Sequence, residues 1–268
     1  MKFKEILGMS WQDYKINFNS IFRFTIFFVL IPLVALTAFQ LIWIGFDANL
    51  LKYSLNPYVE ENIGLSGIYF LSFSSILGIV YLFITLFAYS GLTFASLKKK
   101  FSFKDLIREG KSHYWGYFGL IIVECIFLFG LTLLLVVPGV IFLVYWSLSA
   151  YVYGDEKIGI LKSLKRSRQL VRGNWWRVFG YLILIFLIMG AIGLILSLIA
   201  SPPTAYGAML NLRGNSSSLG LLVLSSLMDI ISRFINRLTI TPFLILFLKN
   251  LYLELKNEKS IKSKRKKK

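Results

Sequence analysis

The stretch WWRVFGYLILIFLIMGAIGLILSLIA, residues 175–200, decides the fold class of this chain. From Val178 to Ala200 it contains no charged residue, and a helix needs about 20 such residues to cross the hydrocarbon core of a bilayer. A second uncharged run extends from Phe24 to Trp43. Both runs predict transmembrane helices and place the protein in the all-α class.

The composition supports a membrane protein. Apolar residues make up 56% of the chain, charged residues only 16%, and the mean hydropathy is +0.68. A soluble domain is about half apolar and a quarter charged. Because a compact chain in water needs a polar exterior, this apolar surplus indicates that lipid surrounds much of the protein.

The net charge of +17 follows membrane orientation rather than nucleic-acid binding. Lysine and arginine are concentrated in the short segments between the apolar runs and in the C-terminal tail, where the positive-inside rule expects them. A nucleic-acid module would need a soluble basic fold, for which the chain has no room. We therefore expect no nucleic-acid partner, and both termini in the cytoplasm.

The chain is predicted to be a polytopic helical bundle with about six spans arranged as three hairpins. Residues 115–153 are too long for one span, and the flanking segments are both strongly basic, so this region crosses twice, with a turn at Pro138-Gly139. Residues 1–255 form a single transmembrane domain, and 256–268 form a basic cytoplasmic tail. The expected spans are residues 20–43, 67–97, 115–136, 139–153, 175–200 and 219–253, the last bent near Pro242.

Three amphipathic helices are expected at the cytoplasmic interface. The first covers residues 3–17, with an apolar side that includes Trp11, Tyr14 and Phe18, while Asp13 lies elsewhere on the turn. The second begins at a Ser102 cap with Asp105 three residues on. The third is capped by Asp155 and ends near Arg172. Its apolar face consists of Ile160, Leu161, Leu164 and Val171, and its polar face includes Lys162, Lys165, Arg166 and Arg172.

An internal repeat is also visible. Residues 102–119 align without a gap on residues 163–180, which matches Trp115 with Trp176 and Gly119 with Gly180. Such repeats are common in transporters, and the same residue types are favoured individually at membrane interfaces.

Several motifs resemble a prokaryotic six-span family that includes the membrane domain fused to some glycerophosphoryl diester phosphodiesterases. They are Pro138-Gly139-Val140, Tyr145-Trp146-Ser147, Ser163, Ser167, Leu170-Val171, Asn174-Trp175-Trp176-Arg177 with Phe179, Thr241-Pro242-Phe243 and Leu251-Tyr252-Leu253-Glu254. The resemblance implies a multi-pass protein of the cell membrane. The fused enzyme uses histidines and metal-binding carboxylates, whereas this chain has one histidine, so hydrolase activity is not carried over.

Few residues are candidates for chemistry. His113 needs a partner carboxylate and a pocket to act as an acid or base, and as a headgroup-level residue it needs neither. Glu124 lies inside an apolar run, where a charge costs about 3 kcal/mol, so it is either a functional group or a neutral side chain bonded to a neighbouring helix. Catalytic residues, metal ligands and cofactors are not expected.

Asp229, Arg233 and Arg237 recur every four residues and share one helical face. They form either an intramembrane polar site, with Arg237 reaching an acceptor such as Glu124, or a water-exposed helical extension with snorkelling arginines.

The leading hypothesis is a non-enzymatic plasma-membrane protein that organises or senses anionic lipids of the inner leaflet through its basic helices. Lys162, Lys165, Arg166 and Arg172 are the expected lipid contacts, each worth about 1 kcal/mol. A protein partner or homo-oligomer is compatible with this role. The alternative is a small transporter or channel subunit with a polar site in the bundle.

Overall fold

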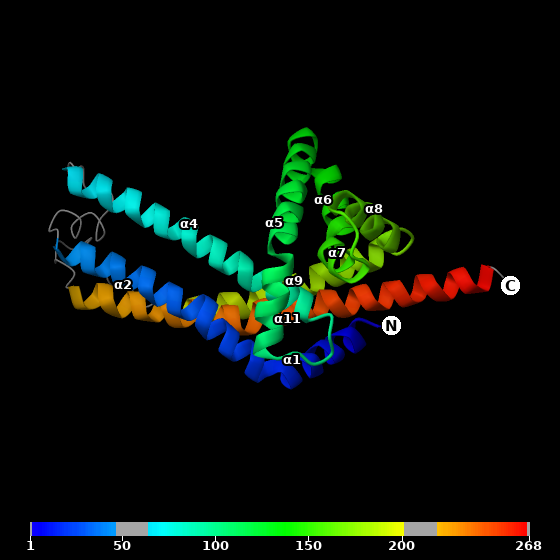
Figure 1. The fold of residues 1–268 in the computed structure, drawn as a ribbon, viewed down its shortest axis with the longest axis horizontal. Helices are drawn as coiled ribbons and strands as arrows, with labels where there is room; N and C mark the ends of the chain where they lie inside the picture. The colour runs from blue at the N-terminus through cyan, green and yellow to red at the C-terminus, as the bar shows by residue number, and fades with distance from the viewer. Residues whose placement is uncertain (1, 47–63, 201–218, 267–268) are drawn as a thin grey trace. The chain divides into compact units, whose positions relative to one another are not determined.

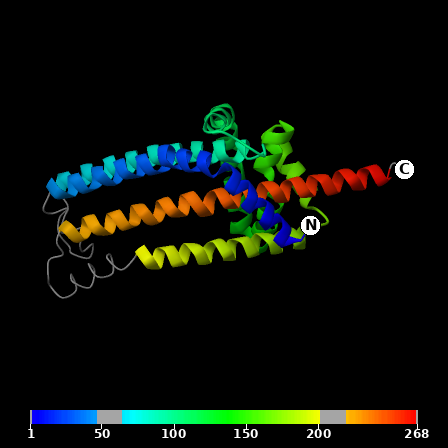
Figure 2. The same ribbon diagram turned by 90° about the horizontal axis from the view of Figure 1, so that it is seen from below.

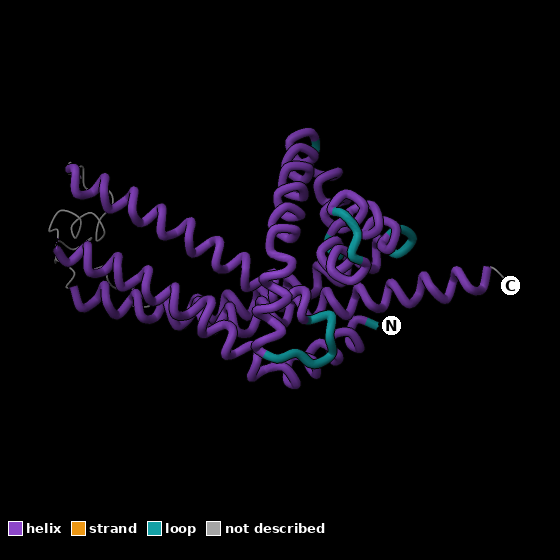
Figure 3. The backbone as a smooth tube through the Cα atoms, in the orientation of Figure 1, coloured by secondary structure: helices purple, strands orange, loops and turns teal. Residues whose placement is uncertain are grey.

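The computed structural model describes residues 2–46, 64–200 and 219–266, and helix is the only regular secondary structure among them (Figure 3). The helices are α1 (Phe3–Thr25), α2 (Ile31–Phe46), α4 (Gly64–Ala95), α5 (Phe103–Leu134), α6 (Val136–Trp146), α7 (Ser149–Glu156), α8 (Ile160–Val171), α9 (Trp175–Ala200) and α11 (Leu219–Lys266), with a π-helical turn, η1 (Ile26–Leu30), between α1 and α2 (Figure 1).

Within the residues that the structure describes, six helical stretches are long and apolar enough to cross a membrane, which confirms the predicted all-α, multi-pass class. Helix α9 has the bounds of the predicted fifth span. The amphipathic segment at residues 3–17 differs from the prediction, because it belongs to α1 and continues through η1 into the first span. Pro32 lacks an N–H and its ring crowds the carbonyl four residues earlier, so the widened π turn just before it accommodates the proline.

The second basic helix is also joined to its span. Helix α5 begins at the predicted Ser102 cap, which forms a complete capping box with Asp105, and continues without a break to Leu134. In the other copy of the predicted repeat, α8 ends and α9 begins anew, because Gly173 adopts the left-handed conformation (φ +90°) that ends a helix. The two copies therefore differ in backbone path, although Trp115 and Trp176 are both highly exposed.

The predicted turn at Pro138-Gly139 is three residues too late. The chain reverses at Leu135, whose backbone is extended, and Pro138 lies in the first turn of α6, where its missing N–H leaves no hydrogen bond unmade. The fourth span is also interrupted: α6 ends at Trp146 and α7 begins at Ser149. Helix α6 alone, at 11 residues, is about 17 Å long, which is shorter than the hydrocarbon core.

Two further expectations are corrected. Gly159, not Asp155, is the N-cap of α8, since Asp155 lies in α7 and binds Tyr252 and Lys256. Helix α11 passes through Pro242 and extends to Lys266, so the helix continues 13 residues beyond the predicted end of the sixth span at residue 253.

The chain divides into two compact units, and α4, α9 and α11 contribute residues to both. Unit 1 comprises Met1–Phe24, Leu86–Gly190 and Ile240–Lys268; unit 2 comprises Thr25–Thr85 and Ala191–Thr239. In unit 2, α2 and α4 run along each other, with the Phe39 and Phe73 rings 5.0 Å apart (Figure 2). Unit 1 holds most of the fully buried side chains, including Leu106, Leu120, Leu148, Val152, Leu170, Val178, Ile185, Phe247, Leu251 and Leu255.

Aromatic contacts connect the helices of unit 1. The Phe3 ring of α1 lies 5.5 Å from both Tyr181 of α9 and Phe247 of α11. The Tyr151 hydroxyl of α7 donates to the Ile245 carbonyl of α11 at 2.8 Å. These contacts fix the basic ends of the helices, where the candidate residues lie.

Replacing Gly91 is expected to disturb the packing of α4 on α5. A Cβ at Gly91 would lie 2.5 Å from the Leu106 carbonyl oxygen, a backbone atom that cannot rotate away. We expect Gly91→Ala to cost about 1–3 kcal/mol and to lower the thermal midpoint measured by intrinsic fluorescence in detergent. Gly78→Ala, in the same helix and with no atom within 4 Å of the added Cβ, is the matched control. Equal midpoints for the two variants would contradict the close packing.

Candidate functional site

Glu124 finds a partner on a neighbouring helix. The hydroxyl of Ser149, on α7, donates to its carboxyl group, and Ser149 is only 2% exposed. A serine on a neighbouring helix is the partner that the structural alternative for Glu124 requires. The sequence did not identify Ser149, because the two residues lie on separate helices 25 positions apart.

Asp229 and Arg233 form an ion pair, with Arg233 Nε 2.8 Å from Asp229 Oδ2. Their side chains are 48% and 60% exposed, and both residues lie in the candidate span Ser226–Ile261. Both residues and Arg237 belong to unit 2, whereas Glu124 belongs to unit 1.

Helix α8 presents a cationic surface. Ser163, Leu164, Ser167, Leu170 and Val171 are buried on one side of it. Lys162, Lys165 and Arg172, three of the four predicted lipid contacts, are exposed. Leu161, which was expected on the apolar face, is 65% exposed.

The other arginines of α8 have specific partners within unit 1. Arg166, one of the four predicted lipid contacts, binds the Glu156 carboxylate, with Nε 3.1 Å from Oε2. Arg168 is exposed and lies over two rings of α6, 5.4 Å from the Phe142 centroid and 5.5 Å from that of Tyr145. Such cation–π contacts hold a guanidinium in place while leaving it accessible. Arg168 was not predicted, although its place on a basic helix near aromatic residues was visible in the sequence.

A buried ion pair joins the first and last helices of unit 1. Lys249 of α11 binds the Asp13 carboxylate of α1, and the two residues are 3% and 8% exposed. Asn250 donates to both Asp13 Oδ2 and Ser10 Oγ at 3.1 Å. Asn17 continues this face of α1 by donating to the Lys99 carbonyl at 3.1 Å and accepting from the Phe101 N–H at 2.8 Å.

The sequence contained one sign of this buried face. Ser10, Asp13 and Asn17 follow an i, i+3, i+7 pattern and therefore share one side of α1. The prediction placed Asp13 off the apolar side of this helix. In the structure Asp13 is buried, while Trp11 and Phe18 of the predicted apolar side are exposed. The partner Lys249 lies 236 positions away, so no local spacing could identify it.

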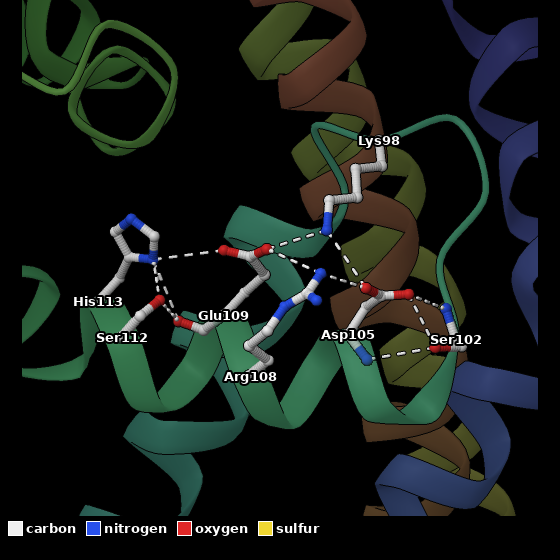
Figure 4. A network of polar contacts seen from close by, with 7 residues as sticks. All are labelled: Lys98, Ser102, Asp105, Arg108, Glu109, Ser112 and His113. Carbon is white, nitrogen blue, oxygen red and sulfur yellow. Dashed lines mark hydrogen bonds and ion pairs between the residues drawn. The ribbon is translucent and has the colours of Figure 1, made fainter.

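A second polar cluster lies where α4 turns into α5 (Figure 4). Lys98 Nζ is 2.9 Å from Glu109 Oε1 and 3.2 Å from Asp105 Oδ1, and Arg108 binds Asp105 at 2.6 Å. The hydrogen bond to Glu109 is the main cause that raises the pKa of Lys98 above its ordinary value. The contribution of the charged Lys98 to the stability of the fold is therefore complete below the ordinary lysine pKa, and it is lost as pH rises through the raised pKa of Lys98.

His113 stands at the end of this cluster without forming a catalytic relay. Its Nδ1 is 2.7 Å from Ser112 Oγ and 3.5 Å from Glu109 Oε2 (Figure 4). In a Ser–His–acid triad, the hydroxyl and the carboxylate contact opposite ring nitrogens. Here both contact the same nitrogen, so this arrangement cannot pass a proton from the serine towards the acid. No group of three or more metal-ligating side chains occurs within residues 2–46, 64–200 and 219–266.

The end of α11 is fastened to the turn between α8 and α9. Arg177 binds Glu258 through two parallel hydrogen bonds of 2.9 Å, and Asn174 donates to Glu258 at 3.3 Å. Lys259 donates to the Arg172 carbonyl at 2.8 Å. Two-pronged arginine–carboxylate pairs fix orientation as well as distance, so this helix end holds the cationic surface of α8 in place.

Removing one partner of the buried pair is expected to be more harmful than replacing both. Lys249→Met leaves Asp13 as an uncompensated buried charge and should cost about 3–5 kcal/mol. Combining it with Asp13→Asn keeps an acceptor for Asn250 and should recover most of the loss in thermal midpoint. A double variant no more stable than Lys249→Met alone would contradict this coupling.

Comparison with known proteins identifies one family. No curated protein and no solved structure matches the chain. The family model of a domain of unknown function, DUF7847, matches residues 56–240 of the sequence. This range is more than half of the chain and includes helices α4 to α9. The chain therefore belongs to the DUF7847 family.

Proposed function

We propose that this protein is a non-enzymatic integral membrane protein that gathers anionic lipids around α8. The observation that carries the proposal is the exposure of Lys162, Lys165 and Arg172 on a helix whose opposite side is buried. Each basic side chain near an anionic leaflet contributes about 1 kcal/mol of attraction.

The rigid seating of α8 supports this role. Ser167 Oγ donates to the Tyr145 carbonyl at 2.6 Å, and the Arg166–Glu156 pair ties the helix to α7. Cations held in place lose less conformational freedom on binding than cations on a mobile tail. Trp176, 77% exposed, and Leu161 lie at the two ends of this segment, and such residues suit the boundary between headgroups and hydrocarbon.

The membrane and the sidedness belong to the same proposal. We place α8 and both termini on the cytoplasmic side of the plasma membrane, because the basic segments between spans would face that side. Assembly with a protein partner or a second copy is compatible with this arrangement. The resemblance to the membrane domain of glycerophosphoryl diester phosphodiesterases fits this proposal, in which the protein acts at the lipid surface without hydrolysing lipid.

Neutralising the exposed cations of α8 is expected to reduce lipid enrichment. The triple variant Lys162→Gln, Lys165→Gln, Arg172→Gln would be reconstituted in nanodiscs made from equal amounts of phosphatidylglycerol and phosphatidylcholine. We expect the phosphatidylglycerol excess, measured by mass spectrometry of the extracted lipids, to fall several-fold, since three contacts of about 1 kcal/mol are removed.

The matched control keeps the charge: Lys162→Arg, Lys165→Arg, Arg172→Lys should enrich phosphatidylglycerol as the natural sequence does. If the neutral triple variant kept the full excess, α8 would not be the lipid-gathering element.

A further inference from the structure

A groove of about 600 Å³ lies between α6 and the start of α9 in unit 1. Its α6 side consists of the aliphatic residues Val136, Val137, Val140 and Ile141. Val136 and Val137 are 66% and 68% exposed, so the protein itself leaves this apolar surface uncovered.

The aromatic residues of the groove come from both α6 and the start of α9. Tyr145, Trp175 and Trp176 complete the lining. Trp175 is fixed across the groove, because its indole N–H donates to the Ile141 carbonyl at 3.4 Å and its ring stacks on Phe179 at 4.9 Å. The Trp175 side of the groove is thus held in place by these two contacts.

The groove is lined by apolar and aromatic residues, and a cation, Arg168, lies next to its lining at Tyr145. Along α6, Val136 and Tyr145 are separated by about 14 Å of helix. The guanidinium of Arg168 lies over the Tyr145 ring, and Lys165 and Arg172 are its neighbours at i−3 and i+4 on α8. A ligand that fills the groove would therefore be apolar along the valines and anionic at Tyr145.

We infer that this groove binds one acyl chain of an anionic phospholipid, with the phosphate held at Arg168. The inference rests on the proposed function, because it converts the general lipid attraction of α8 into one defined site. Charge complementarity selects the headgroup, while the exposed valines select an alkyl chain. The interruption of the fourth span after Trp146 leaves α6 shorter than the hydrocarbon core, and a lipid chain would cover the side that the valines expose.

The test is native mass spectrometry of the full-length protein in detergent, with equal amounts of phosphatidylglycerol and phosphatidylcholine carrying the same acyl chains. The natural sequence should retain one phosphatidylglycerol per chain. Arg168→Gln should lower its occupancy about fivefold, the effect of one basic contact, and Arg168→Lys should restore much of it. Lys104→Gln removes the same charge from an exposed position of α5, outside the lipid-gathering surface of α8, and should retain the lipid.

Filling the groove tests the acyl-chain contact separately. Val140→Trp should remove the retained lipid while leaving the phosphatidylglycerol excess in nanodiscs unchanged, which separates this site from the diffuse enrichment under the proposed function. Thermal unfolding checks that the variant is folded, and Val137→Phe, at a more exposed position, replaces it if it is not. Three results would each overturn the inference. They are undiminished retention in the filled groove, equal retention of both lipids, and equal losses for Lys104→Gln and Arg168→Gln.

Discussion

An unpaired charge is costly wherever water is excluded, and the placement of every charged cluster in unit 1 follows from this constraint. The apolar runs need no partners outside their own helices, because a helix satisfies its backbone internally. Charged residues gather at the basic ends, and those that the packing buries are paired. Asp13 with Lys249 is the most enclosed example, and it joins α1 to α11 at opposite ends of the sequence.

The acidic residues of unit 1 are used largely to hold helices together. Asp105 and Glu109 bind Lys98, Glu156 binds Arg166, Asp155 binds Lys256, and Glu258 binds Arg177. Because the chain carries more than twice as many basic residues as acidic ones, this pairing leaves a cationic excess. On α8 the paired Arg166 lies beside the exposed Lys162 and Lys165, so pairing fixes the helix while the excess charge faces outward.

The fold class was predictable, whereas the joints between helices were only partly so. Apolar runs such as residues 175–200 predict membrane spans by their length alone. Ser102 with Asp105 predicts the start of a helix, because the two residues of the capping box are only three positions apart. The turn at Leu135 and the N-cap at Gly159 were missed, since Pro138 and Asp155 are the stronger local signals. Proline is tolerated in a first helical turn, and Asp155 is occupied by Tyr252 and Lys256 of a distant helix.

The same distinction explains which site residues were found. The exposed cations of α8 depend on periodicity within one helix, which a sequence displays directly. Arg168 depends on what its helix packs against: the hydrogen bond from Ser167 to Tyr145 sets α8 against α6, and only then do two rings lie beneath one guanidinium. The buried Ser167 hydroxyl thus determines the position of the exposed Arg168 guanidinium. The sequence of a basic helix therefore shows how many charges it carries, while its buried face determines which side chains of neighbouring helices lie beside each charge.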